Sequence, residues 1–130
     1  MATKKHHTAE LAKLAADVPG LIDALETEIA EVVASMAELK KAGLIYATEH
    51  WRKDAKGEPK YFYLLYPQKN GEARRRDYVG CDAESIEKAR AGIVRAGEYD
   101  KLAGQHSALS SRGHRVAEAL HEACRYLARK

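Results

Sequence analysis

Apolar residues recur at alternating intervals of three and four positions in two long stretches of the chain. The first stretch holds Ile22, Leu25, Ile29, Val32, Met36 and Leu39. The second begins at Tyr99 and includes Leu109, Val116, Leu120 and Leu127. This heptad spacing predicts amphipathic helices whose apolar sides pack against another helix.

The first third of the chain is predicted to form two helices. Thr8 is a suitable N-cap, so a short helix is expected over residues 8–16. Pro19 then interrupts it, because proline suits the first turn of a new helix. That new helix covers residues 19–42 and ends at Gly43, the residue type that favours the left-handed position after a helix.

The last third is predicted to be helical over residues 83–129, with Asp82 as its N-cap. Gly97, Gly104 and Gly113 lie inside this region, and each costs about 1 kcal/mol relative to alanine in a helix. These glycines mark breaks between helices, close contacts between helices, or both.

Between residues 44 and 80 the pattern changes to short runs rich in aromatic and β-branched residues. These runs are Leu44–Trp51, Lys60–Tyr66 and Arg74–Gly80. Turn-forming residues separate them, and Asn70 followed by Gly71 is the stronger of the two turn signals. The pattern predicts an antiparallel three-stranded meander.

Both faces of the middle strand are apolar or aromatic. Alternation places Phe62, Leu64 and Tyr66 on one face, and Tyr61, Tyr63 and Leu65 on the other. One face is expected to pack on helices, which leaves the other available to a partner.

Together these elements predict an α+β fold in a single domain, residues 1–130, with the meander inserted between long helices that pack as a helical hairpin or coiled coil. We expect the seam of residues 22–39 to pair with the seam of residues 99–127 within one chain, an arrangement that a homodimer would extend through the C-terminal helix. The alternative is that the acidic seam pairs with its own copy in a dimer, although five acids per helix disfavour a parallel self-pair. A plain amphipathic core stripe gives the same spacing.

Charge is unevenly distributed along the chain. The net charge is +3, from 22 Lys and Arg against 19 Asp and Glu. Between Leu21 and Leu39 there are five acids and no base, whereas Trp51 to Arg76 holds eight bases and three acids. Such asymmetry is evidence about partners.

The chain lacks an apolar run of about 20 residues, the length needed to span a membrane. The lysines near its start precede no apolar segment, and the two cysteines, Cys81 and Cys124, lie far apart. We therefore expect a cytoplasmic protein with no membrane association and no disulfide framework.

The basic segment predicts a nucleic-acid interface, because cations contact phosphates and aromatic rings stack on bases or sugars. The candidate contacts are Arg52, Lys53, Lys60, Tyr61, Tyr63, Lys69, Arg74, Arg75 and Arg76. The alternative is a solvated meander whose basic residues protect its edges from aggregation.

Metal and catalytic chemistry have weaker support. His114, Glu118, His121 and Cys124 share one helical face, yet no second cluster supplies further ligands. A solvated helix face is the simpler interpretation, and the sequence alone leaves metal binding there open. No phosphate-binding loop, nucleophile elbow or metalloprotease motif is found, so we expect no enzyme and no cofactor.

The run Lys60–Tyr66, the Asn70-Gly71 turn, Arg74–Gly80 and the step from Tyr99 to Leu102 resemble small uncharacterised bacterial mobile-element proteins. The sheet-then-helix order is also similar to the three-stranded arm-binding domain of tyrosine integrases, which places its sheet in the DNA major groove. This chain departs from that domain by its long preceding helix and by having no catalytic integrase segment.

The resemblance implies contacts to DNA from Arg74, Arg76, Tyr61 and Tyr63. Together with the charge pattern, it predicts a small DNA-binding regulatory or accessory protein from a plasmid, phage or other mobile element. The alternative is a protein-interaction adaptor or inhibitor that docks through its helical seams, without nucleic acid.

Overall fold

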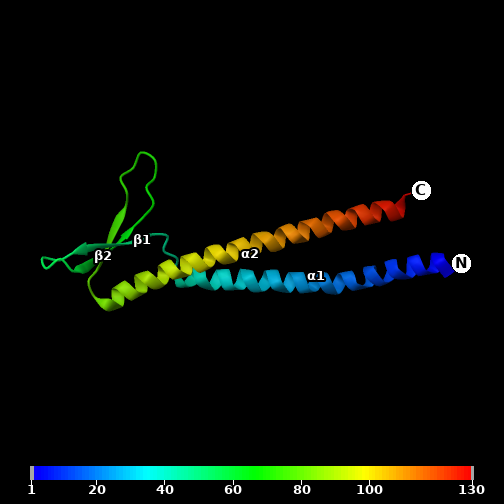
Figure 1. The fold of residues 1–130 in the computed structure, drawn as a ribbon, viewed down its shortest axis with the longest axis horizontal. Coiled ribbons are helices and arrows are strands. Elements are labelled where there is room, and N and C mark those ends of the chain that lie inside the picture. The colour runs from blue at the N-terminus through cyan, green and yellow to red at the C-terminus, as the bar shows by residue number, and fades with distance from the viewer. Residues whose placement is uncertain (1, 130) are drawn as a thin grey trace. The chain divides into compact units, whose positions relative to one another are not determined.

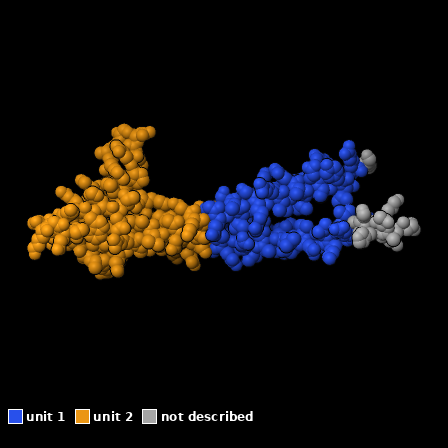
Figure 2. Space-filling view, viewed as in Figure 1, with its two compact units in different colours: residues 1–34, 104–130 blue, residues 35–103 orange. Residues whose placement is uncertain are grey.

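The computed structural model describes the backbone of residues 2–129 and the side chains of residues 8–129. Its elements are α1 (Ala2–Ala42), β1 (Thr48–Lys53), β2 (Pro59–Leu65), β3 (Arg76–Gly80) and α2 (Ala83–Ala128) (Figure 1). The predicted α+β fold, with a three-stranded antiparallel meander between long helices, is confirmed. The chain divides into two compact units: residues 1–34 with 104–130 form unit 1, and residues 35–103 form unit 2 (Figure 2).

α1 continues through Pro19, so the predicted break between residues 16 and 19 is wrong. Proline lacks one N–H and therefore removes one intrahelical hydrogen bond, but its fixed φ near −65° is itself helical. The preceding turns contain Ala12, Ala15 and Ala16, and alanine has the highest helix propensity of all residues. The hydrogen bonds of the helical turns on both sides of Pro19 offset the one that proline removes.

α2 likewise runs unbroken through Gly97, Gly104 and Gly113. A Cβ built on Gly113 would lie 3.5 Å from Leu25 Cδ2, whereas at Gly97 and Gly104 it would meet nothing within 4 Å. Of the two roles predicted for these glycines, breaks do not occur, and helix contact occurs at Gly113, at a distance that leaves room for a Cβ.

Unit 1 is an antiparallel pair of helical segments from α1 and α2, with both chain ends at the same end of the pair (Figure 1). Seam residues Leu25, Ile29 and Val32 are half-buried, and Leu109 is buried. The acidic and basic segments also meet, because Arg112 Nη2 lies 3.7 Å from Glu28 Oε2.

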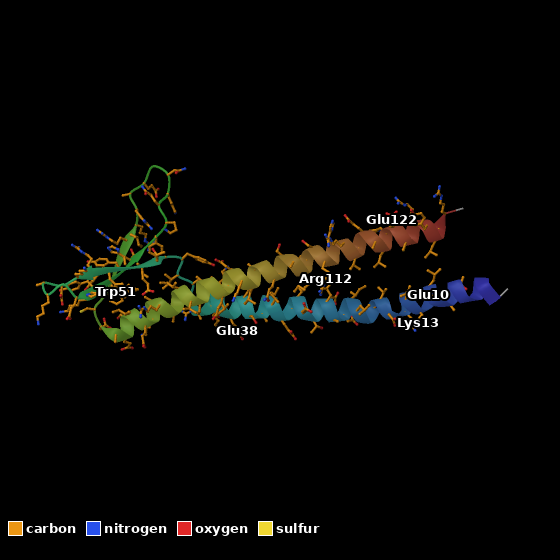
Figure 3. All side chains as sticks on the ribbon, viewed as in Figure 1. Glu10, Lys13, Glu38, Trp51, Arg112 and Glu122 are labelled. Carbon is orange, nitrogen blue, oxygen red and sulfur yellow. The ribbon has the colours of Figure 1, made fainter. Side chains whose placement is uncertain are left out.

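Unit 2 contains the sheet, in the order β1-β2-β3, both pairs antiparallel. Phe62 and Leu64 of β2 are buried with Ala89 of α2, and Trp51, labelled in Figure 3, meets Phe62 edge-on at 4.9 Å between ring centroids. One face of the sheet was expected to pack on helices, and the structure identifies it as the face of Phe62 and Leu64. β1 begins at Thr48, later than predicted, because Ile45 N–H donates to the Gly92 carbonyl of α2, 3.1 Å away.

Local signals end the helices and turn the chain where expected. Gly43 has φ +111° after α1, and its N–H donates to the Leu39 carbonyl at 3.1 Å. Asp82 caps α2, because its carboxylate accepts the Ser85 N–H at 3.0 Å. Gly71 has φ +78° in the β2–β3 turn, which glycine adopts without steric cost.

The connector between β1 and β2 is organised by Asp54. Its carboxylate oxygen Oδ1 accepts the N–H groups of Lys56 at 2.9 Å and Glu58 at 3.0 Å, and Gly57 has φ +82°. An aspartate that bonds backbone groups two and four residues ahead closes the turn locally.

α1 and α2 are both long, but neither contains, among the described residues, a stretch apolar enough to cross a membrane.

Candidate nucleic-acid interface

The sheet face opposite Phe62 is composed of three cross-strand rows. The pairing register aligns Thr48, Leu65 and Arg76 in the first row, His50, Tyr63 and Tyr78 in the second, and Arg52 with Tyr61 in the third. We call these eight residues the open face. It contains two arginines, three tyrosines and a histidine, but no carboxylate.

Tyr63 lies at the centre of the open face. Its ring centroid is 5.0 Å from that of Tyr78 and 6.2 Å from that of His50. The guanidinium of Arg76 lies 5.7 Å from the Tyr63 ring centroid, and Lys60 Nζ lies 5.8 Å from that of Tyr61. These contacts hold cations beside aromatic rings, an arrangement that cation–π attraction favours.

Tyr78 is the most accessible ring of the three, with 55% of its surface exposed, while Tyr61 and Tyr63 are half-buried. Partial desolvation raises the pKa of Tyr78, and the neighbouring Cys81 and Tyr63 add to the shift. Like any tyrosine hydroxyl, that of Tyr78 is protonated at neutral pH, and it is a hydrogen-bond donor beside an exposed ring.

The structure separates the three consecutive arginines that the sequence places together. Arg76 belongs to the open face, whereas the Arg74 Nε–H donates to the Tyr66 carbonyl at 2.9 Å. Arg75 bonds both carboxylate oxygens of Asp77, at 3.3 and 2.9 Å, and lies 4.4 Å from the Tyr66 ring. Because Tyr66 packs against the core cluster, Arg75 lies away from the open face.

The remaining predicted cations lie at the ends of the sheet. Lys53 is the last residue of β1, beyond a register shift after Arg52, and Lys69 lies in the β2–β3 turn. Both are exposed. They extend positive charge past the ends of the strands without contacting the aromatic cluster.

Four residues of the open face are absent from the predicted contact set: Thr48 and Leu65, and the two ring-bearing residues His50 and Tyr78. Strand alternation would have found both, because His50 lies two residues before Arg52, and Tyr78 two residues after Arg76. The acid of β1, Glu49, is on the opposite face, where Arg90 of α2 lies 2.7 Å from it.

Among the described side chains, no group of three or more His, Cys, Asp or Glu residues could hold a metal ion. In the quartet on α2, His114 Nε2 lies 3.2 Å from Glu118 Oε1, and both side chains are exposed. His121 and Cys124 are exposed as well, and Cys124 is a free thiol.

The predicted seam residues differ in burial along the helices. Met36 and Leu39, in unit 2, are half-buried, as are Leu25, Ile29 and Val32 in unit 1. Exposure then rises toward the chain ends, where Ile22, Val116, Leu120 and Leu127 are 37%, 38%, 37% and 75% exposed. The seam is thus covered along only part of its length.

Comparison with known proteins gave no match to the chain among family models, curated proteins or solved structures.

Proposed function

We propose that this protein binds nucleic acid, with duplex DNA as its principal ligand, through the open face of the sheet, and that it acts as a regulatory or accessory factor. The observation that carries the proposal is the placement of Arg52 and Arg76 on one carboxylate-free face with Tyr61, Tyr63 and Tyr78. Arginines supply phosphate and guanine contacts, and tyrosines supply flat surfaces and hydroxyl donors.

The dimensions of the sheet favour a duplex. Adjacent strands lie about 4.8 Å apart, so three strands place their outer backbones about 10 Å apart. The major groove of B-DNA is about 12 Å wide and admits β-ribbons as well as helices. Cations at the strand ends, Lys53 and Lys69, would then lie toward the phosphates that border the groove.

The role of Arg75 is structural in this proposal. Its guanidinium is already bound to Asp77 and stacked on Tyr66, so a contact to DNA would require breaking that pair. We therefore assign the principal contacts to Arg52 and Arg76, with Lys60 beside Tyr61 as a third cation.

The test is a salt titration of binding to a short fluorescein-labelled duplex, followed by anisotropy. Each phosphate contact contributes about 0.9 to the slope of log K against log salt. Combining Arg52→Gln with Arg76→Gln should lower that slope by about 2 and weaken binding at every salt concentration. A matched variant, Lys40→Gln with Lys41→Gln, removes the same charge from exposed positions at the end of α1 and should change the slope little.

Two results would contradict the proposal. One is undetectable binding at low salt, and the other is an equal loss in both double variants, which would indicate a diffuse charge effect. Tyr78→Ala distinguishes duplex from single-stranded ligands, because stacking of an aromatic ring on an unpaired base is worth about 1–3 kcal/mol. If this variant loses affinity only for single-stranded DNA, the ligand of the open face is a single strand rather than a duplex.

A further inference from the structure

The two helices of unit 1 leave apolar residues uncovered toward the chain ends. On α1, Leu11, Leu14 and Leu21 are 54%, 58% and 68% exposed, and on α2, Tyr126 and Leu127 are 62% and 75% exposed. Leu11 continues the heptad spacing of α1 toward its start, through Ala15 and Val18 to Ile22. These leucines therefore lie in or beside the packing seam, yet the partner helix of the same chain does not cover them.

One of these uncovered residues, Leu21, lines a groove between the two helical segments. The groove has a volume of about 400 Å³ and is lined by apolar side chains that include Val18, Leu21, Leu25 and Val116. Its polar edge is formed by Glu28 and Arg112, one from each helix. An apolar groove with a charge of each sign at its edge fits a partner that carries both features.

Charge identifies that partner. Residues 8–34 of α1 carry six acids and one base, a balance of −5, while residues 104–129 of α2 carry four bases and two acids, a balance of +2. Figure 3 labels Glu10 on the acidic segment and Arg112 on the basic one. A surface with an acidic helix beside a basic helix is complementary to its own copy related by a two-fold axis parallel to the helices, because that rotation places each acidic helix opposite a basic one.

The size of the surface also fits a dimer. A segment of 27 helical residues, such as 8–34, is about 40 Å long. Two segments side by side, at about 10 Å spacing, present about 800 Å², the area that each partner buries in a standard protein interface.

From these observations we propose that unit 1 is a dimerisation module. Two copies pack groove to groove as a four-helix bundle in which α1 of one chain lies antiparallel to α2 of the other. This arrangement covers the exposed leucines and places acids opposite arginines, whereas α1 against α1 would oppose two segments of charge −5.

The first test measures the oligomeric state of the full chain without nucleic acid, by sedimentation equilibrium over a range of concentrations. The expected result is a reversible dimer. Leu14→Ser combined with Leu21→Ser should raise the dissociation constant by at least about tenfold, because each change occurs twice in a two-fold interface. Val94→Ser changes a comparably exposed apolar residue of unit 2 and should leave dimerisation unaltered.

The second test examines the pairing of α1 with the partner's α2. Glu26→Lys, Glu28→Lys and Glu31→Lys together change the charge of residues 8–34 from −5 to +1, so that both helices are basic. Arg112→Glu with Arg115→Glu changes the charge of residues 104–129 from +2 to −2, so that both are acidic. Each variant alone should be monomeric, and an equimolar mixture should recover the dimer. A monomeric wild-type chain at every concentration would overturn the proposal, as would a mixture that fails to associate. Binding of DNA is measured separately, so either proposal can fail while the other stands.

Discussion

Gly92 offers the sharpest test of how α2 packs against the segment that leads into the sheet. An alanine Cβ at this position would lie 2.5 Å from Ile45 Cδ1, 2.7 Å from Cγ1 and 3.3 Å from Cβ. The first two distances are shorter than van der Waals contact allows. Since the Ile45 N–H also donates to the Gly92 carbonyl at 3.1 Å, the two segments cannot separate without weakening that hydrogen bond.

The expected stability change is the difference between two effects. Overpacking a close contact costs about 1–3 kcal/mol, while alanine in place of glycine gains up to about 1 kcal/mol of helix propensity. Gly92→Ala should therefore lower the free energy of unfolding by up to about 2 kcal/mol. Gly97→Ala, five residues further along the same helix, meets open space and should raise it by up to about 1 kcal/mol.

Urea denaturation followed by tryptophan fluorescence measures both changes in unit 2. Trp51 is the only tryptophan of the chain and packs on the buried Phe62, so its emission reports the packing of the sheet. Adding Ile45→Val to Gly92→Ala removes the methyl group nearest the new Cβ and should recover part of the loss. If Gly92→Ala stabilises unit 2 as Gly97→Ala does, the close approach of Ile45 to α2 is refuted.

Three further predictions concern local hydrogen bonds. Replacing Asp54 with alanine frees two backbone N–H groups in the β1–β2 connector and should cost about 1–2 kcal/mol of unfolding free energy, measured by the same urea titration. The hydrogen bond from Ser85 holds the pKa of the Asp82 carboxyl below its ordinary value. The stability that this carboxylate contributes is therefore present above about pH 4 and lost as pH falls through the lowered pKa. In melting temperatures measured over a pH series, Asp82→Ala should show a smaller fall at acid pH than the wild type. Partial desolvation and the 2.9 Å hydrogen bond to Asp100 raise the pKa of Tyr46. The contribution of Tyr46 to the free energy of unfolding is therefore complete below about pH 10 and lost as pH rises through the raised pKa. Tyr46→Phe should lack that loss of stability at alkaline pH in the same melting series.

The sequence by itself determined the features that depend on neighbouring residues. Asp82 caps α2, Gly43 follows α1 in a left-handed conformation, and Gly71 turns the chain between β2 and β3. Alternation along β2 was enough to place Phe62 and Leu64 on one face and Tyr61 and Tyr63 on the other, although only the structure shows that the Phe62 face is the covered one. Each of these outcomes follows from backbone geometry or side-chain periodicity within a few residues, which a single sequence contains.

Tertiary structure decided what depends on residues far apart in the chain. The close approach of Ile45 to Gly92 has no local signal, because the glycine is needed only for a segment 47 positions away. Likewise, strand pairing places Arg76 beside Tyr63, while Asp77 and the Tyr66 ring hold Arg75 elsewhere. Three adjacent arginines are equivalent as a sequence; only the register of a sheet, set by hydrogen bonds between strands, makes one of them a residue of the open face.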